Sequence, residues 1–195
     1  MKKLILLGGG GHCKSCVDVI EQENIYEIVG ILDEKNRVGE QVLKYRIVGT
    51  DDDIKKYVSE SCMFLITIGQ IKTSSLRKKI HANLIKNNAQ LATVISPRAY
   101  VSKYAEVGEG SIIMHDVLIN AAVKIGRNCI INTKALIEHD VVVDDFCHIS
   151  TAAVVNGAVK IKEGTFWGSN AVSRERVETS KCGFIKAGSV YKGVE

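Results

Sequence analysis

Proline and aromatic residues are scarce in this 195-residue chain, which has a single proline, Pro97, and only 6% aromatic residues. Long hydrophobic runs are missing from its start, where the longest is Leu4 to Leu7, directly after two lysines. Such a run is too short for a bilayer span or a signal-peptide core, so we expect a cytoplasmic protein with no membrane partner. In that setting the six cysteines should be free thiols rather than a disulfide framework.

Neither sign of charge dominates the sequence. The 26 basic and 22 acidic residues give a formal net charge of +4, and no dense Lys/Arg block occurs, so no nucleic-acid partner is expected. Hydrophobic residues at 46% exclude a disordered chain. The 17 glycines are the abundant feature, and they indicate many close backbone turns.

A six-residue repeat fills the second half of the chain. From Ile95 to Ile161 every sixth residue is Ile or Val, and Trp167 follows. A small or β-branched residue stands four positions after each, from Ala99 onward. Neither helical nor simple alternating periodicity produces this pattern, so we predict a parallel β-helix with 18-residue coils. Cys129 and Cys147, which are 18 residues apart, should then stack.

The repeat weakens near the C-terminus. Ser173 and Thr179 occupy inward positions, before Ile185 restores the pattern. Polar residues line a prism core poorly, so we expect a looped or irregular final coil.

The first half alternates strand and helix patterns. Expected strands are Lys3–Leu7, Glu27–Leu32 and Met63–Ile68, and expected helices are Cys13–Glu23, Ile54–Val58 after a Thr50–Asp53 capping box, and Thr73–Asn87 with Ile80, Leu84 and Ile85 inward. This order predicts a Rossmann-like domain over residues 1–94, with ligands at the carboxyl ends of its strands, and a β-helix domain over residues 95–195.

The glycine run from Gly8 to Gly11 is the first candidate site. It joins a strand to a helix and could receive a phosphate, although the third glycine of a dinucleotide fingerprint is missing and a plain tight turn is the alternative. His12 could donate to a phosphate or a uracil-type group, or could merely cap the helix. Asp33 suits a ribose hydroxyl pair or an amine, or is an ordinary loop acid.

His139 is the second candidate. A lone prism histidine is usually a surface or interface residue, but Glu138 and Asp140 flank this one and His148 follows nine residues later, which favours a site. No metal is expected. Three imidazoles cannot converge because His115 and His139 are four strands apart, and the Cys13–Cys16 CxxC has no second pair and is assigned to core packing.

Five segments together carry a resemblance over nearly the whole chain: GGGGH, ILDE, ITIG, IEHD and FCHIS. The sequence resembles the hexapeptide-repeat acyltransferases of the sialic-acid O-acetyltransferase (NeuD) group and the bacterial UDP-4-amino-sugar N-acetyltransferases (PglD-like). The resemblance implies a left-handed β-helix, a homotrimer with sites between neighbouring prisms, acetyl-CoA along the prism, and a nucleotide sugar held by the head domain.

Residue roles follow from the same resemblance. It implies His139 as the general base, with Asp140 standing where relatives have a Glu that orients the base. His148 would contact the thioester end of acetyl-CoA, and Gly157 and Ser169 would line the coenzyme groove. The acceptor would be surrounded by Gly10, Gly11, His12, Asp33, Glu34 and Gly69. The chain also lacks the Pro-Ala stretch that ends its relatives and helps to pack the coenzyme.

The expected activity is acetyl-CoA-dependent N-acetylation of an amino sugar, with a UDP-linked 4-amino sugar as the first candidate, in bacterial surface glycan synthesis. O-acetylation of sialic acid or a related nonulosonate is the alternative within the enzyme class. A trimeric nucleotide-binding scaffold without catalytic activity is the alternative from another class.

Overall fold

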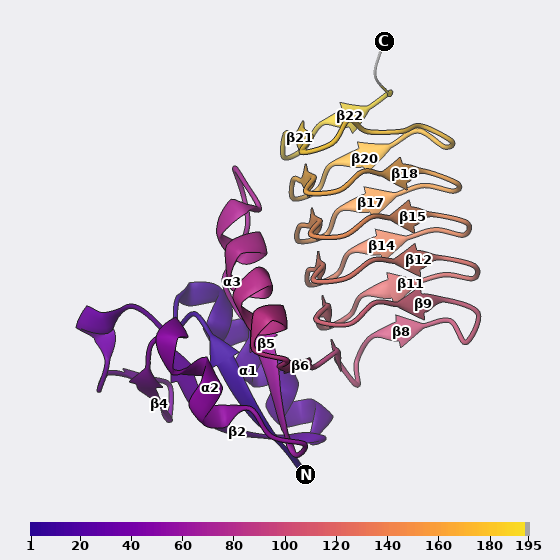
Figure 1. Cartoon of the computed structure of the whole chain (residues 1–195). Coiled ribbons are helices and arrows are strands. Elements are labelled where there is room, and N and C mark those ends of the chain that lie inside the picture. The colour runs from indigo at the N-terminus through magenta and orange to yellow at the C-terminus, as the bar shows by residue number, and fades with distance from the viewer. Residues whose placement is uncertain (194–195) are drawn as a thin grey trace. The chain divides into compact units, whose positions relative to one another are not determined.

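The computed structural model describes residues 1–193, which form two compact units. The first comprises Met1–Gly69 and Ser75–Thr93, and the second comprises Gln70–Ser74 and the residues from Val94 onward. Figure 1 shows a sheet with helices in the first unit and a stack of coils in the second. None of the helices in the described part of the chain is long and apolar enough to span a bilayer.

The first unit contains a six-stranded sheet. Its strand order is β3-β4-β2-β1-β5-β6, and every pairing is parallel except that of β3 with β4. The strands are β1 Lys2–Leu7, β2 Tyr26–Leu32, β3 Gln41–Val42, β4 Tyr45–Gly49, β5 Cys62–Ile66 and β6 Gln90–Leu91. The helices are α1 Gly11–Glu23, α2 Ile54–Tyr57 and α3 Ser75–Lys86, with 3-10 turns at Lys35–Arg37 and Asp51–Asp53.

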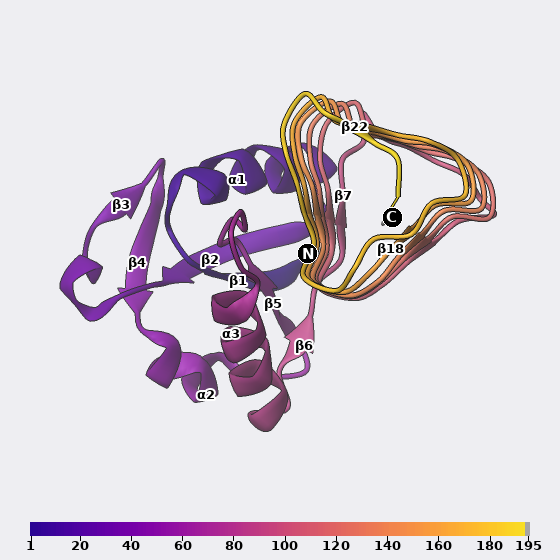
Figure 2. The ribbon, with the colours of Figure 1, turned by 90° about the horizontal axis from the view of Figure 1, so that it is seen from above.

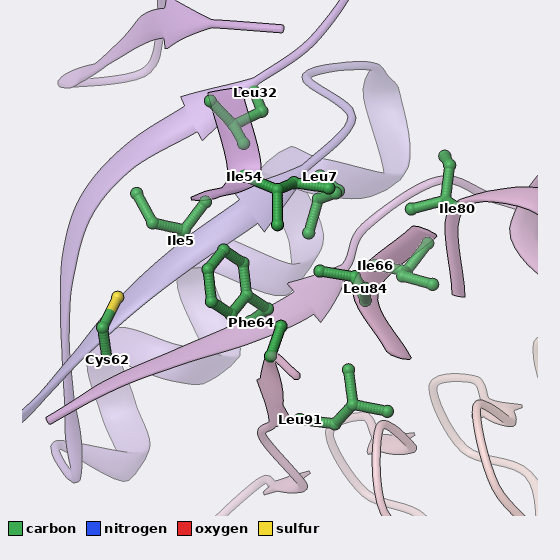
Figure 3. Packing of buried hydrophobic residues seen from close by; sticks show 11 residues of the cluster. Ile5, Leu7, Leu32, Ile54, Cys62, Phe64, Ile66, Ile80, Leu84 and Leu91 are labelled. Atoms are coloured by element: carbon green, nitrogen blue, oxygen red, sulfur yellow. The ribbon is translucent and has the colours of Figure 1, made fainter. Parts of the chain in front are cut away.

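Helices cover both faces of this sheet (Figure 2). On one face, α2 and α3 bring Ile54, Ile80 and Leu84 against the strand residues Leu7 and Phe64 (Figure 3). On the other face, α1 buries one side that includes Cys13, Cys16 and Ile20. The predicted packing of the CxxC cysteines in a helical core is therefore confirmed.

Local sequence signals placed most of these elements correctly, with two errors. The capping box is present, since Asp53 accepts from the Thr50 backbone N–H at 2.9 Å. Ile85, which we expected to point inward, is 50% exposed. The β3–β4 hairpin was not expected, because its turn contains Leu43 at φ 55° instead of a residue typical of such turns.

The second unit is a prism with three sheets of very short strands. The first face contains β7 Val94–Ile95, β10 Ile112–Ile113, β13 Ile130–Ile131, β16 His148–Ile149, β19 Phe166–Trp167 and β21 Phe184–Ile185. The second face contains β8 Tyr100–Val101, β11 Leu118–Ile119, β14 Leu136–Ile137, β17 Val154–Val155, β20 Val172–Ser173 and β22 Val190–Tyr191. The third face contains β9 Glu106–Val107, β12 Lys124–Ile125, β15 Val142–Val143 and β18 Lys160–Ile161.

Strands 18 residues apart pair in parallel, as in Ile113 with Ile131 and Ile131 with Ile149. Every sixth residue from Gly110 to Gly188 turns a corner with a positive φ between 53° and 75°, although most of these residues are not glycine. The predicted hexapeptide β-helix is therefore confirmed, and the arrangement is that of the left-handed form. Cys129 and Cys147 stack as expected, and the hydrogen bond from Cys129, together with burial, raises the pKa of the Cys147 thiol.

The final coil keeps the register better than its composition suggested. Ser173 and Thr179 remain inward and buried, because their hydroxyls accept from the backbone N–H groups of Asn156 at 2.8 Å and Lys162 at 2.9 Å. The irregularity is confined to the third face, where a single bridge from Lys160 to Glu178 replaces a strand. The expected looped coil was thus wrong for the other two faces.

Candidate active site

The glycine run forms the turn between β1 and α1. Gly8 has φ +100°, and a Cβ there would lie 2.2 Å from Cγ1 of Ile68. A Cβ on Gly10 or Gly11 would meet nothing within 4 Å. Helix α1 begins at Gly11, and no described side chain caps its first turn, so its N–H groups and helix dipole favour an anion in this open space.

The end of β5 holds the turn in place. Thr67 Oγ1 donates to the carbonyl oxygens of Gly8 at 2.6 Å and Leu7 at 3.1 Å. Behind it, Nη1 of the buried Arg77 donates to the carbonyl oxygens of Ile66 at 3.1 Å and Ile68 at 2.5 Å. The loop that ends at Gly69 is thereby fixed against the glycine turn.

Asp33 fixes the same turn from the other side. Its Oδ2 accepts from the Gly9 N–H at 2.8 Å and pairs with Nη1 of Arg37, while its Oδ1 accepts from the Glu34 N–H at 2.8 Å. No role was predicted for Arg37 from the sequence. Its spacing of four residues from Asp33 was the available signal, since such a pair can meet across one turn.

A cavity of about 400 Å³ lies over the glycine turn. It brings together all six residues for which an acceptor-binding role was predicted: Gly10, Gly11, His12, Asp33, Glu34 and Gly69. A second cavity of about 360 Å³ adjoins it through shared Gly8 and Asp33, and adds Asp51 and Asp52, which sequence reasoning also missed. The role of these residues in binding an acceptor remains a prediction.

In the β-helix, His139 and Asp140 form a corner between the second and third faces. Nδ1 of His139 lies 2.8 Å from Oδ2 of Asp140, and the two side chains are 63% and 61% exposed. Asp140 is the corner residue itself, with φ 61°, a conformation that Asp tolerates better than most residues. The shorter Asp thus reaches the imidazole at Nδ1, which leaves Nε2 on the opposite side of the ring.

Gly157 leaves room for that ring one coil further on. A Cβ at this position would lie 2.8 Å from both Cε1 and Nε2 of His139. The space beside Nε2 of His139 therefore exists only because residue 157 is glycine.

His148 is in a different environment. It is 6% exposed, its Nδ1 lies 2.5 Å from the carbonyl oxygen of Gln70, and its Nε2 lies 3.1 Å from Nδ2 of Asn132. Since Oδ1 of Asn132 accepts from the Thr133 N–H, its Nδ2 donates to Nε2, and the neutral ring carries its proton on Nδ1. Sequence reasoning missed both partners, and the predicted contact of His148 with the coenzyme remains a prediction.

Ser169 lies at the edge between the first and second faces, where its hydroxyl is 2.9 Å from that of Ser150. His139 and Gly157 lie at the other edge of the second face, whereas His148 lies on the first face. One protomer therefore distributes the predicted site residues over two edges of its prism.

Two other kinds of site were considered for residues 1–193, a reactive cysteine and a metal centre. Burial raises the pKa of the Cys13 thiol, which disfavours a reactive thiolate. In this part of the chain, no group of three or more His, Cys, Asp or Glu side chains is arranged to hold a metal ion.

A glycine-turn α/β unit, followed by a hexapeptide β-helix that carries an exposed histidine, resembles the arrangement in NeuD/PglD-like proteins. Residues 3–84 match the family described as the PglD N-terminal domain. The resemblance that the sequence motifs indicated is thereby confirmed.

Three relatives illustrate the likeness. UDP-N-acetylbacillosamine N-acetyltransferase of Bacillus subtilis (strain 168) is 32% identical over 117 residues, which is 58% of this chain, and the match spans about half, 52%, of that protein. The acetyltransferase domain of PglB from Neisseria gonorrhoeae FA1090 is 27% identical, with TM-score 0.90 and coverage of 99% and 92% of the two chains. A His-to-Asn mutant of perosamine N-acetyltransferase from Caulobacter crescentus, in complex with CoA and GDP-perosamine, is 28% identical, with TM-score 0.91 and coverage of 99% and 90%.

The geometry of the glycine turn predicts different outcomes at two neighbouring positions. Gly8→Ala should lower the thermal unfolding midpoint, because the new Cβ meets Ile68 and the backbone has a positive φ. Gly11→Ala, the matched control, has open space and should leave the midpoint nearly unchanged. Calorimetry on both variants checks this, and equal midpoints would contradict the described turn.

Proposed function

We propose that the chain is an acetyl-CoA-dependent N-acetyltransferase of a nucleotide-linked amino sugar, with a UDP-linked 4-amino sugar as the first candidate acceptor, in bacterial surface glycan synthesis. The observation that carries the proposal is the exposed His139–Asp140 pair beside the hollow at Gly157. The cavity over the glycine turn supports the proposal that the acceptor sugar is linked to a nucleotide. We place the reaction in the cytoplasm, since all six cysteines are free thiols, as in a reducing compartment.

His139 is the proposed general base. With Nδ1–H donating to Asp140, the neutral ring carries its lone pair on Nε2, where it can take a proton from the acceptor amine. Asp140 also stabilises the imidazolium that forms. Acetyl-CoA supplies a thioester whose carbonyl carbon bonds to the amine nitrogen while the C–S bond breaks and the thiolate of CoA leaves.

Gly157 has two proposed contributions. The hollow that its missing side chain leaves beside Nε2 gives room for the thioester end of acetyl-CoA. No residue in the described range 1–193 accepts a hydrogen bond from its N–H, so we assign this group to the thioester oxygen, on which negative charge develops.

A homotrimer is the proposed assembly. Along the second face the outward residue of every strand is apolar: Tyr100, Leu118, Leu136, Val154, Val172 and Val190. Of these, Tyr100 is 61% and Val190 is 60% exposed, while outward positions of the third face include charged residues such as Lys124. Covering the second face with another copy would bring His139 of one protomer toward Ser169 and His148 of the next. Because such a contact joins two different edges of the prism, it is heterologous, and three prisms form the smallest ring that closes it.

The acetyl transfer itself can be tested with a thiol-release assay. We expect CoA release from acetyl-CoA with a UDP- or GDP-linked amino sugar, because these combine a nucleotide with an amine. A panel that adds CMP-linked sugars and free sialic acid distinguishes the alternatives. Turnover with sialic acid alone would support O-acetylation instead. Absence of turnover with every acceptor would refute the enzyme and favour the nucleotide-binding scaffold without catalytic activity.

The proposed base makes a kinetic prediction. His139→Ala should lower kcat by roughly 10² to 10⁴, the usual effect of losing a general base, with little change in the melting temperature. Asp140→Asn should lower kcat by a smaller factor, because it removes only the orientation of the ring and the negative charge that stabilises the imidazolium. His115→Ala is the matched control, since this prism histidine contacts Ser96 at 2.6 Å and should retain kcat. A fully active His139→Ala would refute the assignment.

The assembly makes a separate prediction. Sedimentation should give a mass three times the 21.3 kDa of the chain. Leu118→Glu on the second face should break the trimer and abolish activity together, because a buried unpaired charge opposes association. Lys124→Ala on the third face is the control and should leave both intact. An active monomer at micromolar concentration would contradict a site shared between protomers.

A further inference from the structure

Arg37 contacts Gly9 and Asp33 in the acceptor cavity and Glu40 outside it. Its Nη1 pairs with Asp33, its Nη2 donates to the Gly9 carbonyl oxygen at 3.4 Å, and its Nε donates to Glu40 at 3.0 Å. The side chain is 29% exposed and lines the cavity together with the glycine turn. The guanidinium thus lies beside the place where the turn and the start of α1 favour an anion.

The surrounding charges are mostly negative. Asp33 and Glu34 line the same cavity as Arg37, and Asp51 and Asp52 line the adjoining one together with the cation Lys35. Burial, and after it the charges of Asp33 and Asp52, raise the pKa of Asp51, whereas the charge of Lys79 lowers it. A diphosphate brought to the glycine turn would therefore meet repulsion unless a cation offsets it.

We propose that Arg37 is the counter-charge that lets this acidic cavity accept the diphosphate of a nucleoside diphosphate. The inference rests on the proposed function, because it assumes a nucleotide in the head domain. Asp33 is needed to hold the Gly9 N–H, yet its carboxylate would repel phosphate. Pairing with Arg37, which also pairs with Glu40, offsets part of that charge while the hydrogen bond to Gly9 remains.

The three contacts of Arg37 use the planar fork of a guanidinium. A lysine would carry the same charge on a compact ammonium group, which lacks the planar fork of the guanidinium. Arg37→Lys should therefore restore part of what Arg37→Gln loses. This conservative variant separates the effect of charge from that of shape.

The test is calorimetric titration of UDP and of GDP into the wild-type protein and its variants. Arg37→Gln should weaken binding of the nucleotide that the wild type prefers by roughly tenfold or more, and the loss should shrink as salt is raised. The double variant Arg37→Gln with Asp33→Asn should bind more tightly than Arg37→Gln alone, since the uncompensated negative charge is then gone. Arg46→Gln, on β4 and outside both cavities, is the matched control.

The outcomes separate this inference from the function on which it rests. If the wild type binds UDP or GDP and Arg37→Gln binds equally well, the role of Arg37 is refuted and the proposed function stands. A double variant that binds no better than Arg37→Gln would also refute the role of charge. If the wild type binds neither nucleotide, the nucleotide-binding head itself is refuted, and the inference falls with it.

Kinetics with the accepted sugar provides a second readout. Arg37→Gln should raise the KM for the nucleotide sugar while kcat and the KM for acetyl-CoA stay close to their wild-type values. A merely structural defect would lower the melting temperature and affect both substrates.

Discussion

Backbone hydrogen bonds between successive coils are the constraint on which the β-helix depends. Each coil of 18 residues must turn three corners in register, and each corner requires a positive φ that costs a residue other than glycine roughly 1–2 kcal/mol. Ladder bonds such as Ile130 N–H to the Cys147 carbonyl oxygen at 2.9 Å offset that cost at every level. The same register places Gly157 directly beside His139, so the candidate base and the space it needs both follow from the repeat.

In the head domain, the equivalent constraint is electrostatic. A turn of four glycines has no side chains to hold it, so Thr67 and Asp33 fix it through its backbone atoms. Using a carboxylate for this purpose places negative charge where phosphate is expected to bind, and Arg37 is the cation in contact with it. The shape of the site and its charge are therefore determined by the same few bonds.

His139 and His148 show how environment separates two similar side chains. The first is exposed, with one ring nitrogen held by Asp140 and the other facing a hollow. The second is buried, and both of its ring nitrogens are engaged in hydrogen bonds. The first histidine and Ser169 lie on different edges of one prism, and the homotrimer proposed above would bring them together from neighbouring copies.

The sequence alone determined the repeat, the inward aliphatic positions and the glycine turn, because each is a pattern of near neighbours. It did not determine that Ser173 and Thr179 would stay inward, since that depends on hydrogen bonds to the coil below. Only the tertiary structure decided the partners of His148, one of which, Gln70, is 78 residues away. Contacts between residues so far apart in the sequence depend on how the folded segments pack together, and the same holds for the cavity that Arg37 lines. Local periodicity in the sequence does not predict such packing.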